Sequence, residues 1–208
     1  MSDRKLSYNI RINKYILECV HGYYDPIVSE FVAERYYNSN GYEFKSSLNE
    51  LKELIKMEDK MYIDEAYIYT VYDEEGNILG SIRKILKLSN KKLPIEREFN
   101  VNLQEYLDEY SRIYEIARFT IKDCNPRVLN ILFKEGLKEY SDSSLMVASL
   151  DANVLNSLRR LGFNWKEIQE PKRYLGSITV PVILEKNKIN NIFCRSVEEK
   201  CNEVKLWI

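Results

Sequence analysis

An acidic and a basic residue interrupt the most strand-like segment of the chain, Glu115-Ile116-Ala117-Arg118-Phe119-Thr120-Ile121. Successive residues of a strand point to opposite faces of a sheet, so Glu115 and Arg118 would point apart unless a β-bulge realigns them. Two charges in an otherwise buried strand need a reason, and bulges are frequent next to active sites. This segment is therefore our first candidate site.

The segment is followed by a polar turn over residues 122–126 and then by a run with helical period over residues 127–140. The N-terminus of a helix and the backbone amides of a preceding turn attract anions. We therefore expect this strand, turn and helix to hold a polar or anionic ligand.

Composition limits the class of protein. The chain has 208 residues, of which 45% are hydrophobic, so we expect one globular domain over residues 1–208. Its 31 basic and 32 acidic residues leave a formal charge of −1. This balance encodes no general attraction to nucleic acid or to a membrane surface.

Cysteine and histidine usage argues against a metal site. The four cysteines form no Cys-x-x-Cys pair, and His21 is the single histidine, so we expect neither a metal nor a disulfide framework. No apolar run reaches the roughly 18 residues of a membrane span, and residues 1–5 are polar. We expect a cytoplasmic protein without an integral membrane segment.

Helical spacing dominates the first 60 residues, which we interpret as a helical N-terminal lid. Apolar residues recur at this spacing over residues 12–19, 27–36 and 48–55. Pro26 and Ser47 suit the starts of the second and third of these helices.

The remainder predicts strands and then alternating strands and helices. Residues 66–72 and 78–86 form a hairpin around an acidic turn, and residues 103–110 form a short helix. Further strands are predicted over residues 113–121, 144–150 and 173–185, and helices over residues 127–140 and 152–161. Pro181 places the last strand at an edge or a bulge. The fold class is α/β, a central mixed sheet flanked by helices on both faces, with a C-terminal tail, 186–208, that docks on the domain.

Five short motifs occur in one order along residues 28–185. They are Ala33-Glu34-Arg35-Tyr36-Tyr37 before Gly41-Tyr42, Gly80-Ser81-Ile82-Arg83, Glu115-Ile116-Ala117-Arg118-Phe119, Leu158-Arg159-Arg160-Leu161-Gly162-Phe163, and Tyr174-Leu175-Gly176-Ser177-Ile178-Thr179-Val180-Pro181-Val182. In this order the chain resembles the GNAT acyltransferase superfamily, and within it the N-acyl amino acid synthases and the acyl-homoserine-lactone (autoinducer) synthases. The resemblance implies a GNAT-type N-acyltransferase fold with a twisted mixed sheet.

The resemblance also implies an activity. A long-chain acyl group would pass from a thioester donor, acyl-coenzyme A or an acylated acyl carrier protein, to the amine of an amino acid or homoserine lactone. Two alternatives stay open: a short-chain N-acetyltransferase that uses acetyl-coenzyme A, and a catalytically silent domain that binds acyl groups or a partner.

The resemblance assigns roles to residues of the candidate site. Glu115 would take the amine proton, directly or through a water, and Arg118 would act beside it. Arg35, Arg83 and Arg118 would clamp an acceptor carboxylate. The remaining positions would contact the substrate, the pantetheine arm or the oxyanion: Phe119, Thr120, Ile121, Asn125 and Arg127. The opposing interpretation is a salt bridge from Glu115 to Arg118 between adjacent strands, with the other arginines on the surface.

The chain departs from the acetyl-coenzyme A enzymes of the superfamily at two places. Their glycine-rich loop is replaced by Lys122-Asp123-Cys124-Asn125-Pro126-Arg127, which contains no glycine, and their later asparagine and tyrosine by Asp151 and Leu158. These departures favour a carrier protein, which presents only a phosphopantetheine arm. An acidic carrier could dock on basic residues that could equally be solvated: Lys84, Lys87, Lys91, Lys92, Arg127, Lys134, Lys138, Arg159 and Arg160.

Overall fold

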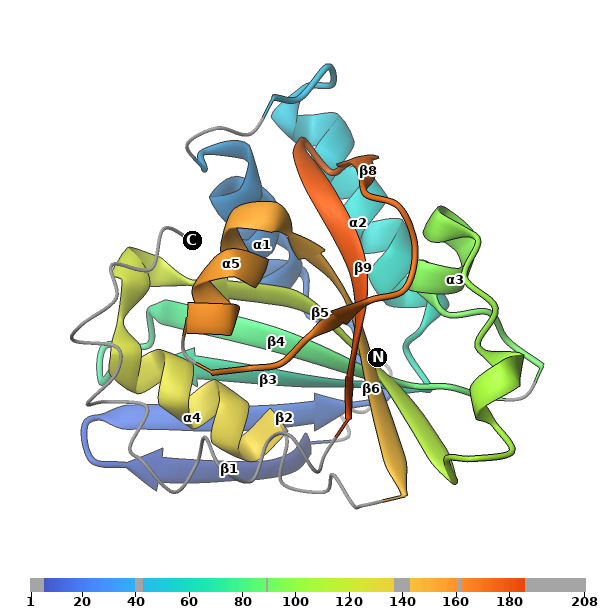
Figure 1. Cartoon of the computed structure of the whole chain (residues 1–208). Coiled ribbons are helices and arrows are strands. Elements are labelled where there is room, and N and C mark those ends of the chain that lie inside the picture. The colour runs from blue at the N-terminus through green and yellow to red at the C-terminus, as the bar shows by residue number, and fades with distance from the viewer. Residues whose placement is uncertain (1–5, 40–42, 89, 137–142, 161, 186–208) are drawn as a thin grey trace.

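The computed structural model describes residues 6–39, 43–88, 90–136, 143–160 and 162–185. Within them nine strands form one sheet in the order β1-β2-β3-β4-β5-β6-β9-β7, and β8 also pairs with β9 (Figure 1). The strands are β1 Leu6–Ile12, β2 Tyr15–His21, β3 Ala66–Tyr72, β4 Ile78–Leu86, β5 Arg112–Ile121, β6 Ser144–Asp151, β7 Lys166–Glu167, β8 Lys172–Tyr174 and β9 Ser177–Glu185. Only the pairing of β5 with β6 is parallel in this sheet.

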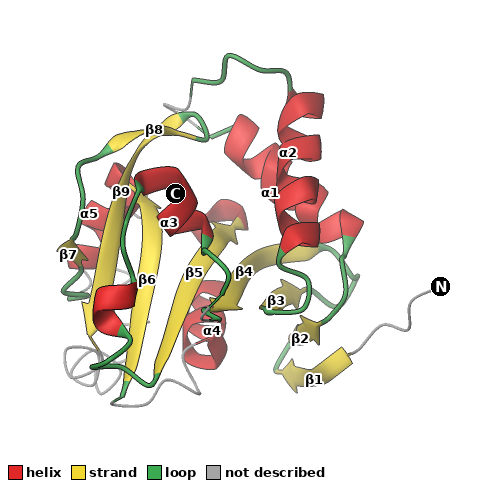
Figure 2. Ribbon diagram, turned by 90° about the vertical axis from the view of Figure 1, so that its right-hand side faces the viewer, coloured by secondary structure: helices red, strands yellow, loops and turns green. Residues whose placement is uncertain are grey.

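Helices cover both faces of the sheet, as predicted (Figure 2). They are α1 Pro26–Tyr37, α2 Leu48–Met61, α3 Pro94–Phe99, α4 Pro126–Gly136 and α5 Ala152–Arg160. Helix α4 packs on the face of β4 that carries Gly80 and Ile82. Helix α2 contacts Arg83, which points to the opposite face. The predicted tail, 186–208, lies outside the described residues.

The starts of α1 and α2 follow the signals in the sequence. Asp25 accepts a hydrogen bond from the Ile27 amide at 2.9 Å, and Pro26 occupies the first turn of α1. Ser47 and Glu50 form a reciprocal capping box at the start of α2.

The predicted helix over residues 12–19 is wrong, because this segment forms the β1–β2 hairpin. Ile12 pairs with Tyr15 around a two-residue turn, in which Asn13 has a φ of 55°. The apparent helical spacing ran across this turn from one strand to the next. Within β2, Tyr15, Leu17 and Cys19 lie two residues apart and pack in the same core cluster, which is the period of a strand.

The edge or bulge predicted for the last strand is also wrong, because β9 is an inner strand and its register with β6 runs through Pro181 without a shift. β9 pairs with β6 along one side and with β7 and β8 along the other. The Pro181 carbonyl accepts from the Ile168 amide at 3.1 Å. Because the N–H and C=O of one strand residue point to the same side, the missing proline donor faces the short strand β7 rather than β6.

Two further differences concern short helices. Residues 94–99 form α3, a helix that our sequence analysis does not predict. The helix predicted over residues 103–110 is reduced to the 3₁₀ turn Gln104–Tyr106.

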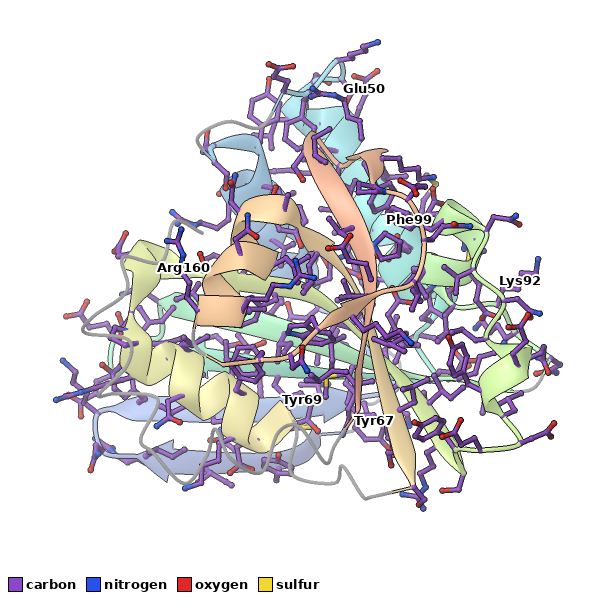
Figure 3. All side chains as sticks on the ribbon, in the orientation of Figure 1. Glu50, Tyr67, Tyr69, Lys92, Phe99 and Arg160 are labelled. Carbon is purple, nitrogen blue, oxygen red and sulfur yellow. The ribbon has the colours of Figure 1, made fainter. Side chains whose placement is uncertain are left out.

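Two of the lysines suggested for carrier docking are buried. Lys84 is 3% exposed, and its Nζ lies 5.1 to 5.6 Å from the ring centres of Tyr67, Tyr69 and Tyr114. Figure 3 shows how side chains such as Tyr67 and Tyr69 fill the space around the sheet. Lys87 is 8% exposed and binds Glu96 at 3.0 Å. These two lysines therefore belong to the interior, and Lys138 lies outside the described residues.

Gly80 lets α4 approach β4 closely. A Cβ atom at this position would lie 2.8 Å from Val128 Cγ1 and 3.0 Å from the Thr120 carbonyl oxygen. We expect Gly80→Ala to lower the free energy of unfolding by about 1–3 kcal/mol, measured by urea denaturation. Gly136→Ala is the matched control, since its Cβ would come no closer than 3.7 Å to a neighbour. An equal loss in both variants would contradict this account of the α4–β4 contact.

Candidate active site at the β5 bulge

β5 carries one residue more than β4 at the candidate site. Ser81 pairs with Thr120 and Arg83 pairs with Ala117, so Arg118 and Phe119 together lie opposite Ile82. Arg118 has a φ of 56°, an uncommon value for a residue other than glycine. The bulge suggested by the sequence is present, and it lies at Arg118.

β5 and β6 separate at the same level. Their parallel pairing ends with Ile116 opposite Ala148, although both strands continue for several residues. Figure 2 shows the two strands diverging toward one end of the sheet. The bulge thus lies beside an opening between two neighbouring strands.

Two clefts meet at this opening. The first cleft, about 570 Å³, is lined by Arg35, Tyr36, Ser39, Ile116, Ala117, Arg118, Phe119, Thr120, Ile121, Ser149, Leu150, Asp151 and Val154. The second cleft, about 360 Å³, is lined by Tyr36, Glu58, Pro94, Glu98, Glu115, Ile116, Ala117, Arg118, Ser149, Tyr174 and Leu175. Five residues line both: Tyr36, Ile116, Ala117, Arg118 and Ser149.

The structure brings most of the predicted site residues to these clefts. Arg35, Phe119, Thr120 and Ile121 line the first cleft, Glu115 lines the second, and Arg118 lines both. Arg83, Asn125 and Arg127 line neither. The roles assigned to all of these residues stay predictions.

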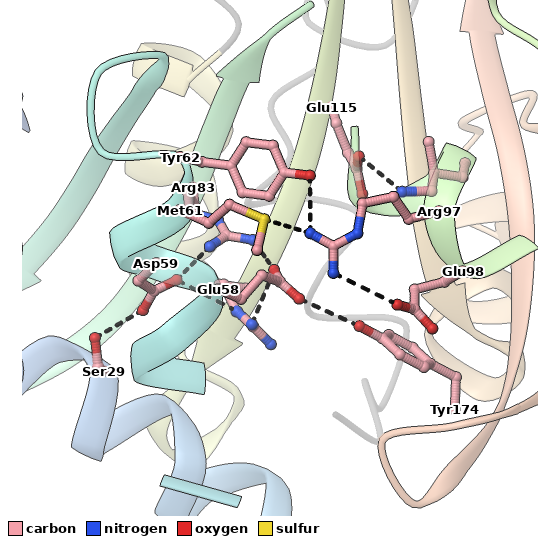
Figure 4. A network of polar contacts seen from close by, with 12 residues as sticks. Ser29, Glu58, Asp59, Met61, Tyr62, Arg83, Arg97, Glu98, Glu115 and Tyr174 are labelled. Carbon is pink, nitrogen blue, oxygen red and sulfur yellow. Dashed lines mark hydrogen bonds and ion pairs between the residues drawn. The ribbon is translucent and has the colours of Figure 1, made fainter. Parts of the chain in front are cut away.

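Glu115 is buried in the wall of the second cleft. Its side chain is 1% exposed, and its Oε2 accepts a hydrogen bond from the Ile95 amide at 3.1 Å (Figure 4). Burial, together with the charge of Glu58, raises the pKa of Glu115 to about 8, against the lowering effects of the Ile95 amide and of the two arginines. A carboxyl group with such a pKa can exchange protons near neutral pH.

A cluster of four buried charges adjoins Glu115. Arg83 contacts both Glu58 and Asp59 at the end of α2, and the Arg118 Nη2 atom lies 2.9 Å from Glu58 Oε1 (Figure 4). Burial acts to raise the pKa of Glu58, but the charges of Arg118 and Arg83 outweigh it and hold this pKa at about 2. The two cations are therefore balanced by two anions. Among the described residues no ion pair joins Arg118 to Glu115, so the simple strand-to-strand salt bridge is not what the structure contains.

The outer contacts of the cluster fix its carboxylates. Ser29 Oγ donates to Asp59 Oδ2 at 2.7 Å, and the Tyr174 hydroxyl donates to Glu58 Oε2 at 3.3 Å. Arg35 of α1 donates from Nη2 to the Ile121 carbonyl at 3.3 Å. Helices α1 and α2 are thereby tied to β4 and β5. An acceptor carboxylate would have to compete with Glu58 and Asp59 for the guanidinium groups of Arg83 and Arg118.

The residues of this site that our sequence analysis missed include Tyr36, Glu58, Asp59 and Ser149. Glu58 and Asp59 sit in a helix rich in lysine and glutamate, where acidic residues are usually solvated. Tyr36 lines both clefts, and Thr120 is a hydrogen-bond partner of its hydroxyl. The only signal in the sequence was its place inside the Arg35 motif.

The side chain of Asn125 caps the N-terminus of α4. Asn125 Oδ1 accepts from the amides of Arg127 at 3.0 Å and Val128 at 3.4 Å, and Pro126 has no amide hydrogen. Amides that would otherwise be available to an anion are thus engaged within the protein.

At the level of sequence, neither a protein-family model nor a curated protein matches the chain. Solved structures do match. FeeM, an N-acyl amino acid synthase from uncultured soil microbes, superposes with a TM-score of 0.58 at 14% identity, over 82% of this chain and 90% of that one. The fold is that of the GNAT acyltransferases. The fold class implied by the motifs is therefore confirmed.

Two other structures share this fold. An uncharacterized protein (bh2621) from Bacillus halodurans matches over 95% of this chain and 100% of that one, with a TM-score of 0.56 at 10% identity. TofI in an apo form matches over 89% of this chain and 95% of that one, with a TM-score of 0.53 at 15% identity.

Within the described residues no group of three or more His, Cys, Asp or Glu side chains is placed to hold a metal ion. None of the described helices has both the length and the apolar character needed to cross a membrane.

The charge cluster predicts a large effect at Glu58. Glu58→Gln would leave two buried guanidinium groups with one carboxylate, so we expect the free energy of unfolding to fall by about 3–5 kcal/mol. Glu53→Gln, on the exposed side of the same helix, should change it by less than about 0.5 kcal/mol. Urea denaturation measures both. Similar small changes in the two variants would show that the cluster does not depend on Glu58.

The raised pKa of Glu115 predicts a dependence of stability on pH. Its pKa rises from 4.5 to about 8 on folding, so folding takes up a proton between these values. The free energy of unfolding should therefore fall as the pH rises from about 5 to about 8. Glu115→Gln, which stays neutral, should lose part of this fall, as measured by urea denaturation across that range. Identical pH dependence in both proteins would contradict the buried, protonated state of Glu115.

Proposed function

We propose that this protein is an N-acyltransferase that moves an acyl group from a thioester to the amine of a small molecule. The observation that carries the proposal is the place of Glu115, a buried carboxyl group with a pKa of about 8, beside a bulged strand where two clefts meet. The first cleft would take the acyl donor, and the second would take the amine.

The reaction is the aminolysis of a thioester. The amine nitrogen attacks the carbonyl carbon, the oxyanion collapses, and the carbon–sulfur bond breaks to give an amide and a thiol. Glu115 in its carboxylate form accepts the proton that the amine loses, directly or through a water. The leaving thiolate then takes up a proton. The pKa of about 8 at Glu115 is close to those of a free α-amino group, about 7.7–8.0, and of a thiol, about 8.5. One carboxyl group is therefore suited to both proton transfers.

Positioning and stabilisation of the oxyanion would supply most of the acceleration. A bulge leaves its extra residue out of the strand ladder, so backbone amide groups near Phe119 are suited to bind the donor. The left-handed conformation of Arg118 turns the chain at this point. This supports the roles proposed for Phe119, Thr120 and Ile121.

The start of α4 favours a donor that is recognised through its pantetheine arm. Asn125 engages the first amides of α4, which leaves fewer donors for the pyrophosphate of coenzyme A. We therefore propose an acyl carrier protein as the preferred donor, with acyl-coenzyme A as the weaker one. The apolar part of the first cleft, Phe119, Leu150 and Val154, supports an acyl chain longer than acetyl.

The acceptor would be a primary amine of the size of an amino acid or its lactone. Because Glu58 and Asp59 already neutralise Arg83 and Arg118, a carboxylate on the acceptor is not required for charge balance. An amino acid lactone or a neutral amine therefore fits this cleft at least as well as a free amino acid.

The test is a transfer assay with mass-spectrometric detection. Acetyl, decanoyl and palmitoyl donors, on coenzyme A and on a carrier protein, are each incubated with the protein, a mixture of amino acids and homoserine lactone. We expect an N-acyl product from a decanoyl or palmitoyl carrier donor. A product from acetyl-coenzyme A alone would establish the short-chain reaction instead, and donor binding without any product would indicate a silent acyl-binding domain.

Glu115→Gln tests the proposed base. We expect kcat/KM to fall by a factor of about 10²–10⁴. In the wild type both the amine and Glu115 must lose a proton, so the rate should rise more steeply with pH below about 8 than in the variant, where only the amine titrates. Glu53→Gln should match the wild type. An unchanged rate and pH profile in Glu115→Gln would remove Glu115 from the mechanism.

A further inference from the structure

Ser149 carries a hydroxyl group without a partner at the junction of the two clefts. Its Oγ atom is buried and makes no hydrogen bond within the described part of the chain. Its side chain lines both the first and the second cleft. A buried hydroxyl without a hydrogen bond is unfavourable, and native proteins rarely retain one without a reason.

The strand register places Ser149 on the same face as Glu115. Glu115 lies opposite Val147 in the parallel β5–β6 pair, and Ser149 is two residues further along β6. Residues two apart in a strand point to the same face. Ser149 is thus on the face of the sheet that carries Glu115. It also comes directly after the last β5–β6 pair, Ile116 with Ala148, where the strands separate.

The backbone around Ser149 gives no structural use for its hydroxyl. Ser149 lies opposite Pro181 in the β6–β9 pair, and the Pro181 carbonyl binds the Ile168 amide on the other side. Arg118 forms ion pairs with Glu58 and Asp59, although its Nε and Nη2 atoms make no hydrogen bond among the described residues. Two other neighbouring polar groups have partners of their own. Tyr174 binds Glu58, and Glu115 accepts from the Ile95 amide.

We infer that the Ser149 hydroxyl donates a hydrogen bond to the carbonyl oxygen of the acyl thioester, and to the oxyanion that forms from it. This inference rests on the proposed function. In that function the acyl donor occupies the first cleft and the amine the second, so the reacting carbonyl lies where the two clefts meet. Ser149 forms no covalent bond in this role. It completes on β6 the group of donors that the bulge provides on β5.

Ser149→Ala is the first variant. We expect kcat to fall by a factor of about 10²–10³ with little change in the KM of the amine, which is the effect of losing one oxyanion donor. The melting temperature should stay equal to that of the wild type or rise, because the lost hydroxyl had no partner. Ser149→Thr, which keeps the hydroxyl, should retain most of the activity.

Ser81→Ala is the matched control. Ser81 Oγ is also buried without a partner among the described residues, but Ser81 lines neither cleft. Its removal should leave both activity and stability close to those of the wild type. Equal activity in Ser149→Ala and the wild type, or a change confined to the KM of the amine, would overturn the inference.

A binding measurement separates this inference from the proposed function. Two analogues of decanoyl-pantetheine cannot react: a ketone, which keeps the carbonyl oxygen, and a thioether, which lacks it. By isothermal titration calorimetry the wild type should bind the ketone about fivefold to tenfold more tightly, and Ser149→Ala should lose this preference. If the wild type prefers the ketone, Ser149→Ala loses this preference and no acyl transfer is observed, the proposed transferase activity is refuted but the Ser149 hydrogen bond stands. Turnover with the same preference in both proteins, or no binding of either analogue, would refute the contact.

Discussion

Two guanidinium groups cannot be buried under a sheet without anions beside them, and this requirement organises the protein. Arg83 of β4 and Arg118 of β5 are 1% and 7% exposed, and Glu58 and Asp59 of α2 balance them. The end of α2 must therefore lie over these strands. Ser29 of α1 binds Asp59, and Tyr174 of β8 binds Glu58, so the walls of the second cleft depend on the same cluster. Such a cluster adds little net stability, which makes positioning the better reason for its presence.

The β5 bulge is what allows Arg118 to join the charge cluster. One extra residue in β5 brings Arg118 to the face that carries Arg83, within reach of the α2 carboxylates. The cluster is then neutral by itself, so Glu115 remains as a further buried carboxyl group beside it. Burial and the nearby Glu58 charge favour its protonated form and place its pKa near 8. The raised pKa of Glu115 is thus a result of burial and of charge balance in its surroundings.

Much of the fold could be predicted because it follows local patterns. The β3–β4 hairpin, strands β5 and β6, and the starts of α1 and α2 are encoded by alternation, turn residues and caps. β1 and β2 were missed because their apolar residues matched a helical period across the turn at Asn13. The site was predicted where charge interrupts a pattern, at Glu115 and Arg118. Glu58, Asp59 and Ser149 could not be found this way, since their significance lies in contacts, or a missing contact, with residues far along the chain.

The five residues common to the two clefts have a thermodynamic consequence. Tyr36, Arg118 and Ser149 line both clefts, so a molecule bound in one cleft would contact side chains that also form the other. Any such coupling is reciprocal: if the first ligand changes the affinity for the second by some factor, the second changes the affinity for the first by the same factor. No distant conformational change is needed for this. Any coupling between ligands of the two clefts would act through this single layer of shared side chains.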